Sequence, residues 1–221
     1  MCGKFTQMMS WSELVTLADL IGKSSGPVET VTPMRVAGVI HLDSLGRRVT
    51  SRMRWGFVPA NAPDPTVGTK FIHARAETIE QKPTYREAFF HRRGIVPVHT
   101  FNEGEEVTPT KTRQHIISPR DGKPLGIAVV WERWSARNEA ALFSFAMVTV
   151  AANQLIGRIT DRMPAVIAPG HWAKWLGEEP ASVDELKSIL EPMEADWDMQ
   201  PAGKPPPPPK PKKPSQQPDL F

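Results

Sequence analysis

Residues 36–55 have the sequence VAGVIHLDSLGRRVTSRMRW, which predicts a β-hairpin. Two runs, Val36 to Leu42 and Arg48 to Trp55, contain residues that favour strands. Between them, Asp43 to Gly46 supplies the aspartate, serine and glycine that tight turns favour. We therefore expect the chain to be built on antiparallel β-structure.

Further strands and helices follow this hairpin or precede it. We predict a buried strand from Ile95 to Phe101, a second hairpin from His115 to Ser118 and Leu125 to Trp131 around a turn at residues 119–122, and strands from Phe143 to Val150 and Met163 to Ile167. Capping boxes predict helices that begin at Ser10, Thr84 and Ser182, the first ending at Gly22 and the second running through Phe90. The pattern predicts an α+β fold: a single domain with a curved or barrel-like, mostly antiparallel β-sheet flanked by short helices.

The composition predicts one domain followed by a tail. The chain has 221 residues, of which 40% are hydrophobic, enough for one sizeable core. Residues 1–197 form the predicted domain, and residues 198–221, with their proline run, predict a disordered tether. Lysine and arginine exceed aspartate and glutamate by 3, and residues 201–221 carry that whole excess. The body is therefore nearly neutral, so any nucleic-acid face depends on where its arginines lie.

Several classes of protein are disfavoured by the same composition. No stretch approaches the roughly 20 apolar residues that cross a membrane, and the N-terminus lacks the layout of a secretory signal. Cys2 is the only cysteine, so no internal disulfide can form. The six histidines are scattered, and nothing indicates a metal or an organic cofactor. We expect a protein of the reducing cytoplasm.

Cys2 is the main candidate for chemistry. Met1 before a small residue is normally removed, which would leave Cys2 exposed as the first residue, with an α-amine and a thiol on adjacent carbons. Both groups are partly reactive near neutral pH, since their reference pKa values are about 8 and about 8.5. The amine can condense with an aldehyde to an imine, and the thiol can close a five-membered thiazolidine. Gly3 allows close approach of a bulky partner. The alternative is an incidental cysteine on a frayed terminus.

Several segments spread along the chain carry a family resemblance. They are Met1-Cys-Gly-Lys-Phe5, Arg54-Trp-Gly-Phe-Val-Pro59, His73-Ala-Arg-Ala-Glu-Thr78, Arg92-Arg-Gly-Ile-Val-Pro97 with Phe101-Asn-Glu103, and Asp161-Arg-Met-Pro164. Over roughly residues 1–176, the chain resembles the SOS-response-associated peptidase (SRAP) family, proteins that crosslink covalently to abasic sites in single-stranded DNA. The resemblance implies that the partner of Cys2 is the aldehyde that an abasic sugar exposes when its ring opens. It also implies association with the nucleoid.

The resemblance implies roles for several polar residues. Glu103 matches a carboxylate beside the cysteine, which can shuttle protons; the alternative is a solvated acid in the run from Glu103 to Glu106. Phosphate-binding positions match Arg75 and Arg162, with Lys4 in place of the usual arginine, and Thr149 matches a polar position near the pocket. For each arginine the alternative is a surface ion pair.

Trp55, Phe57 and Pro59 could supply a stacking or wedging edge beside the lesion, because stacking on bases tolerates any sequence. The alternative is packing in the core, which we favour for Trp55.

Two positions depart from the family pattern. His73 stands where the family usually has asparagine, and Thr160 stands where it usually has a histidine implicated in acid–base chemistry and in reversal of the crosslink. Threonine does not titrate near pH 7, so either the reaction is slower or another residue carries out the proton transfer. One hypothesis is that His73 supplies the imidazole from the other side of the pocket; the alternative is a structural histidine. The residues that flank the acid, Asn102 and Gly104, also replace an aromatic residue and a tryptophan.

The C-terminal residues Gln217-Pro-Asp-Leu-Phe221 resemble the short peptides by which bacterial repair proteins bind the sliding clamp. Leu220 and Phe221 would be apolar anchors, and Gln217 would hydrogen-bond the pocket rim. The alternative is an accidental apolar end.

Three functional hypotheses follow for the whole chain. The first is covalent trapping of abasic sites in single-stranded DNA through a thiazolidine at Cys2. The second is an N-terminal-cysteine peptidase or amidase, whose base would be the α-amine. The third is a non-catalytic, clamp-tethered module that binds single-stranded DNA, which Thr160 favours.

Overall fold

The structure is a computed structural model that describes residues 2–7, 29–136 and 140–203. The predicted helix from Ser10 to Gly22 and the peptide from Gln217 to Phe221 lie outside these residues. The strands are β1 (Lys4–Gln7), β2 (Glu29–Val31), β3 (Val36–Leu42), β4 (Arg48–Trp55), β5 (His73–Arg75), β6 (Arg93–Val98), β7 (Thr100–Thr108), β8 (Lys111–Pro119), β9 (Leu125–Trp134), β10 (Leu142–Ala151), β11 (Arg162–Pro164), β12 (Val166–Ile167) and β13 (Trp197–Pro201). The helices are α2 (Pro83–His91), α3 (Trp172–Leu176) and α4 (Val183–Ile189), with 3₁₀ turns at Pro65–Lys70, Ile156–Arg158 and Pro169–His171.

A closed barrel forms the centre of the molecule. In the described part of the chain, β10, β4, β3, β6 and β9 pair in that order, and β9 returns to β10. Each pair is antiparallel except β10 with β4. Its fully buried side chains include Val39, Met53, Ile95 and Phe145. Closure of the ring removes the free edges that a strand would otherwise expose.

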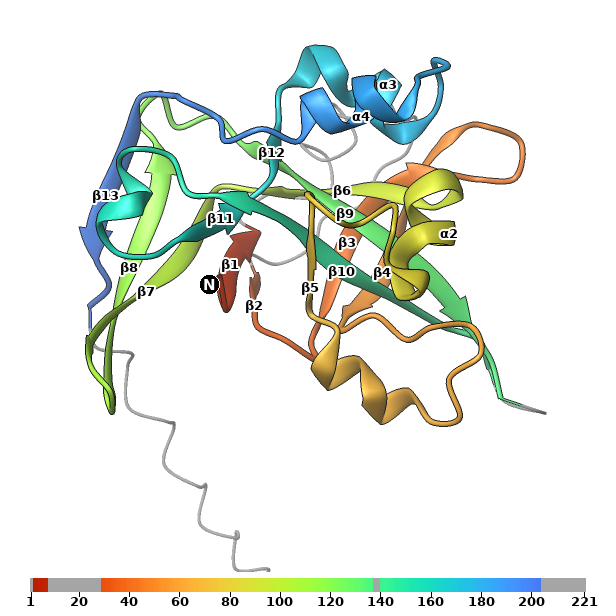
Figure 1. The fold of residues 1–221 in the computed structure, drawn as a ribbon, viewed down its shortest axis with the longest axis horizontal. Helices are drawn as coiled ribbons and strands as arrows, with labels where there is room; N and C mark the ends of the chain where they lie inside the picture. The colour runs from red at the N-terminus through yellow and green to blue at the C-terminus, as the bar shows by residue number, and fades with distance from the viewer. Residues whose placement is uncertain (1, 8–28, 137–139, 204–221) are drawn as a thin grey trace, which may run out of the picture.

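A second sheet lies beside the barrel, in the order β13, β8, β7, β1, β2 (Figure 1). It packs aromatic side chains from distant segments together, as with Phe101 and Trp197, whose ring centroids are 5.9 Å apart. β1 is flanked on both sides, by β7 and by β2. Lys4–Gln7 is therefore held inside a sheet, between two neighbouring strands.

The predicted fold class is confirmed: the chain forms one domain, mostly β, with a closed barrel and short helices. The hairpin at residues 36–55 is also confirmed, because β3 and β4 pair from Val36 with Arg54 to Leu42 with Arg48. Its turn is stabilised by Asp43, whose side chain accepts hydrogen bonds from the backbone N–H groups of Leu45 and Arg47. The capping box at Ser182 is present at the start of α4.

Two of the predicted strand assignments are wrong. The segment from Ile95 to Phe101 is divided between β6 and β7, which belong to different sheets. β8 and β9 do not form a hairpin: β8 pairs with β7 and β13, whereas β9 pairs with β6, β10 and β12. In each case a turn carries the chain from one sheet to the other.

The structure also moves the start of one helix and extends the folded part of the chain. α2 begins at Pro83 after Lys82, without the side-chain cap predicted at Thr84, because proline is itself favourable at the first helical position. β13 runs from Trp197 to Pro201 and pairs with β8, so ordered structure continues four residues past the boundary placed at residue 197. In the described residues, none of the helices is long and apolar enough to cross a membrane.

Candidate functional site

Cys2 lies two residues before β1 and is only 1% exposed. The expectation of an exposed cysteine is therefore wrong for the chain as described, because the side chain of Cys2 belongs to the buried core that also contains Phe5 and Phe101. The thiol donates a hydrogen bond to the carbonyl oxygen of Lys4, with 3.4 Å between sulfur and oxygen. Gly3, in contrast, is exposed, and no atom lies within 4 Å of the place where a Cβ would be.

The thiol of Cys2 is held in its protonated form. Burial raises its pKa, and the negative charge of Glu103 raises it further, while the backbone N–H groups of Lys4 and Asn102 oppose the shift. Since only the thiolate is a strong nucleophile, this cysteine needs a nearby group that takes its proton.

Glu103 lies beside Cys2 because β1 and β7 pair, with Lys4 opposite Asn102. Its side chain has no exposed surface, which contradicts the alternative of a solvated acid. Burial raises the pKa of Glu103 to about 7, the charge of Asp161 adds to the rise, and the backbone N–H of Cys2 opposes it. A carboxyl with this pKa can both give and take a proton near neutral pH.

His73 approaches Cys2 from the barrel. It lies on β5, opposite Met147 of β10, and its ring centroid is 6.0 Å from that of Trp55. Burial lowers the pKa of His73 to about 4, and the backbone carbonyl of Cys2 opposes the shift. The imidazole is therefore neutral at pH 7. We call Cys2, Glu103 and His73 together the Cys2 corner.

The two aromatic residues of the Arg54–Pro59 segment are buried in the core. Trp55 and Phe57 have no exposed surface, so the structure contradicts a stacking edge for both and places them in the core. Trp55 donates its indole N–H to the carbonyl oxygen of Ile72 at 2.8 Å, and its ring lies 5.1 Å from that of Phe5. Trp55 thus connects β1 to the strand that carries His73. Pro59 is partly exposed.

The predicted arginines lie on either side of β10. Thr149 pairs with Arg75 of β5 on one side and with Pro164 of β11 on the other. Arg75 is exposed, whereas the side chain of Arg162 is only 12% exposed.

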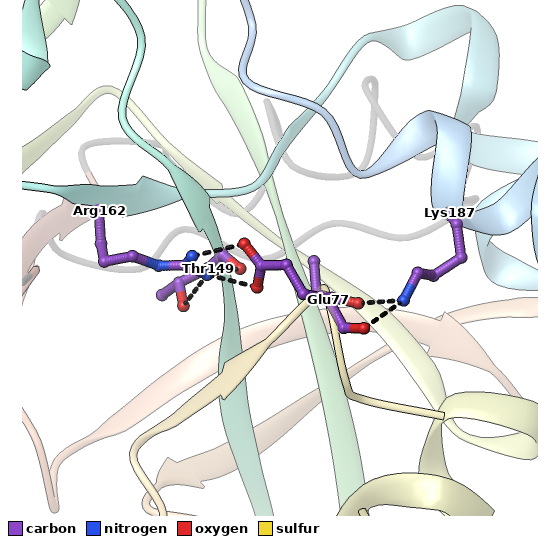
Figure 2. A network of polar contacts seen from close by, with 5 residues as sticks. Glu77, Thr149, Arg162 and Lys187 are labelled. Carbon is purple, nitrogen blue, oxygen red and sulfur yellow. Dashed lines mark hydrogen bonds and ion pairs between the residues drawn. The ribbon is translucent and has the colours of Figure 1, made fainter. Parts of the chain in front are cut away.

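Arg162 binds both carboxylate oxygens of Glu77, at 2.5 and 2.9 Å, and donates to the carbonyl and hydroxyl oxygens of Thr149 at 2.7 and 3.3 Å (Figure 2). We call Arg75, Glu77, Thr149 and Arg162 the arginine edge.

The remaining predicted residues lie near these two groups. Lys4 is partly exposed in β1. Thr160 is also partly exposed, and its backbone N–H donates to the carbonyl oxygen of Ile156 at 3.1 Å. It directly precedes Asp161, whose charge acts on Glu103. In the described ranges, no group of three histidine, cysteine or acidic side chains could hold a metal ion.

Three features of the surface were not predicted from the sequence. Glu77 has a local signal, since it stands two residues after Arg75 in the His73–Thr78 segment. Lys187 of α4 has none, although its ammonium donates to the carbonyl oxygens of Ala76 and Glu77 and to the carboxylate of Glu80, at 2.7, 2.9 and 2.8 Å. The third feature is a hollow of about 610 Å³ next to β2, lined by Thr30, Val31, Thr32, Met34, Arg35, Val36 and Arg52.

This hollow combines two arginines with an unusual backbone. Met34 adopts a left-handed conformation (φ 70°), which is costly for a residue with a side chain and concentrates at functional sites. Arg35 and Arg52 are both exposed. Because β2 is the neighbour of β1, the hollow lies on the side of β1 away from β7.

Comparison with solved structures supports the fold. A crystal structure of a protein from Bacteroides thetaiotaomicron matches with a TM-score of 0.77 at 20% identity, covering 92% of this chain and 93% of that one. A crystal structure of a protein from Bordetella bronchiseptica gives a TM-score of 0.77 at 21% identity, covering 91% of this chain and 100% of that one.

Sequence comparison identifies relatives as well. The abasic site processing protein YoaM of Bacillus subtilis (strain 168) is 31% identical over 200 residues, which cover 89% of this chain and 88% of YoaM. The abasic site processing protein HMCES of Xenopus tropicalis is 29% identical over 171 residues, covering 66% of this chain and 50% of HMCES. The model of the family described as SOS response associated peptidase (SRAP) matches residues 1–204. Since this match spans almost the whole chain, the protein belongs to the SRAP family.

Proposed function

We propose that this protein processes abasic sites in single-stranded DNA by trapping them covalently at Cys2 after removal of Met1. The observation that carries the proposal is the Cys2 corner, where a buried thiol, a carboxyl with a pKa of about 7 and a neutral imidazole meet. The names of the relatives, abasic site processing proteins, support the same substrate.

The reaction balances without a cofactor. The α-amine of Cys2 adds to the C1′ aldehyde of the open sugar, and the resulting carbinolamine loses water to give an imine. The sulfur then attacks the imine carbon, and the thiol proton ends on the nitrogen, which closes the thiazolidine. The overall change is aldehyde plus aminothiol to thiazolidine plus water.

Glu103 fits both proton transfers. In its neutral form it can give a proton to the departing hydroxyl, and as a carboxylate it can then take the proton of the thiol. Such a base is needed because burial and the charge of Glu103 keep the thiol protonated. His73 is neutral at pH 7 and lies beside Cys2, and its pKa of about 4 makes it a weaker proton acceptor than Glu103.

The DNA backbone would bind at the surface around this corner. Gly3 leaves open space beside the cysteine, so a deoxyribose could approach the backbone there. Arg75, Arg162 and Lys4 would contact phosphates, with Thr149 holding Arg162 in place. Of Trp55, Phe57 and Pro59, it is Pro59 that retains exposed surface for contact with a base.

The decisive test is a denaturing gel of the purified protein incubated with single-stranded DNA that contains one abasic site. We expect a heat-resistant shifted band that disappears in Cys2→Ala. Binding without a band would favour the non-catalytic module, and peptide turnover that requires Cys2 would favour the peptidase. Cys2→Ser replaces the thiol by a hydroxyl of similar size, and it should lose the band as well if the sulfur closes the ring. Intact mass comes first: retention of Met1 excludes the thiazolidine.

We also propose that the tail contacts the bacterial sliding clamp through Gln217, Leu220 and Phe221. A peptide of this kind on a proline-rich tether would raise the local concentration of the domain at replicating DNA. Replacing Leu220 and Phe221 by alanine should abolish binding to purified clamp, while crosslinking to free DNA stays unchanged. Unchanged clamp binding would exclude the contact.

A further inference from the structure

Both terminal nitrogens of the Arg162 guanidinium already donate hydrogen bonds within the protein. Two of its nitrogens bind the carboxylate of Glu77, and one of these also binds Thr149. Its Nε is buried and has no hydrogen-bond partner. A phosphate therefore cannot simply be added to Arg162, because the two-pronged end of the guanidinium is occupied.

Glu77 presents two oxygens to this fork in the way that a phosphate would. The guanidinium fork binds carboxylates and phosphates by the same pair of parallel hydrogen bonds. The side chain of Glu77 is 51% exposed, so it can rotate into water without opening the core. Thr149 would keep its bond to Arg162 during this exchange, because it binds from the strand side.

Lys187 confines the movement to the side chain of Glu77. Its ammonium holds the carbonyl oxygens of Ala76 and Glu77, so α4 fixes the backbone of the turn after β5 (Figure 2). Figure 2 shows Glu77 between Arg162 and Lys187. The turn therefore keeps its position whether or not the carboxylate remains on Arg162.

We propose that Glu77 competes with a DNA phosphate for the guanidinium of Arg162, and that binding of single-stranded DNA displaces it. This inference rests on the proposed function for the identity of the ligand. Arg75 is the exposed neighbour whose charge acts on Glu77, so an incoming phosphate would first meet Arg75 and then exchange with Glu77. This competition lowers the affinity for undamaged DNA, because a phosphate can bind Arg162 only when the ion pair between Arg162 and Glu77 is broken.

The test compares Glu77→Gln with wild type in binding a fluorescent oligodeoxythymidylate that contains no abasic site. Glutamine keeps the size of the side chain and removes the competing charge, so we expect about three- to tenfold tighter binding. Glu87→Gln is the matched control, because it removes one exposed carboxylate whose ion pair is with His91 of the same helix and not with Arg162. We expect less than a twofold effect there. Thermal unfolding of each variant confirms that it is folded.

A double-mutant cycle with Arg162→Ala tests whether the gain in affinity acts through Arg162. The gain from Glu77→Gln should vanish when Arg162 is absent. Weaker or unchanged binding by Glu77→Gln overturns the proposal, and so does a gain that persists without Arg162. Crosslinking to abasic DNA is measured separately: its failure with an intact gain in affinity would refute the proposed function alone. Absence of DNA binding in wild type would overturn both.

Discussion

The Cys2 corner and the arginine edge hold charged groups by opposite physical means. In the corner, burial sets the protonation of the thiol, Glu103 and His73, and each stays in or near its neutral form. At the arginine edge, the charge of Arg162 is retained and matched by Glu77. Desolvation tunes groups that must exchange protons, whereas ion pairing keeps ready a charge that must bind another charge. The corner is therefore suited to chemistry and the edge to binding.

Glu103→Gln should have the largest effect on the chemistry of the Cys2 corner and almost none on the arginine edge. Removing the titrating carboxyl should slow crosslinking about 10²- to 10³-fold, since a positioned acid–base group typically contributes that much. Binding of undamaged single-stranded DNA should change less than twofold. Single-turnover gels give the rate, and fluorescence anisotropy gives the affinity.

The matched control for this variant is Glu106→Gln, which removes an exposed carboxylate from the far end of the same strand. It should leave the rate unchanged. An equal loss in both variants would mean that Glu103 contributes only to the overall charge.

Glu103→Gln should also make the protein more stable at high pH. Folding raises the pKa of Glu103 from 4.5 to about 7, so the folded state binds the proton more tightly than the unfolded state. The stabilisation is full below the unfolded pKa and is lost as the pH rises through about 7. Glutamine stays neutral, so at pH 8 the free energy of unfolding should exceed that of wild type by about 1–3 kcal/mol. At pH 4, below the unfolded pKa of 4.5, urea denaturation should show almost no difference. If the free energy of unfolding depended on pH in the same way in wild type and in Glu103→Gln, a raised pKa for Glu103 would be contradicted.

These two groups of residues were not equally predictable from the sequence. The hairpin at residues 36–55 follows from local rules, because Asp43 and Gly46 specify the turn and the flanking runs favour strands. The contact of Cys2 with Glu103 joins residues about a hundred positions apart, through the pairing of β1 with β7. No local pattern encodes that pairing, so only the family resemblance connected the two. The burial of Cys2 was missed because a chain terminus is usually frayed.

The composition of a turn also gave a wrong prediction where that turn joins two sheets. Pro119 to Gly122 has the composition of a hairpin turn, yet the backbone N–H of Arg120 donates to the carbonyl oxygen of Asp196 at 2.9 Å, beside β13. The turn therefore sends β8 and β9 into different sheets. Glu77 and Arg162 are likewise 85 positions apart, and their ion pair depends on β5 and β11 lying on either side of β10. Local composition does not contain such tertiary information.

A smaller effect is expected from restoring a titratable group at Thr160. Thr160→His would place an imidazole next to Asp161, whose charge acts on Glu103. We expect both formation and reversal of the crosslink to accelerate about tenfold, the low end for an added acid–base group. Formation is measured in single-turnover gels, and reversal by chasing the crosslink with excess unlabelled abasic DNA. Thr160→Ser should behave as wild type, and unchanged rates with histidine would exclude a proton-transfer role for this position.

The smallest effect should come from Arg75, and it should fall on binding alone. Because Arg75 is exposed, Arg75→Ala removes one phosphate contact, and we expect about threefold weaker binding to single-stranded DNA. The slope of log K against log salt should fall by about 0.7, the value for one phosphate on a single strand. At saturating DNA, the crosslinking rate should stay unchanged, because Arg75 is assigned to phosphate binding and not to proton transfer. Arg86→Ala on α2 is the matched control, also exposed, and should alter neither quantity. A slower rate at saturating DNA would show that the arginine edge takes part in the chemistry. The assignment of chemistry to the Cys2 corner and of binding to the arginine edge would then be wrong.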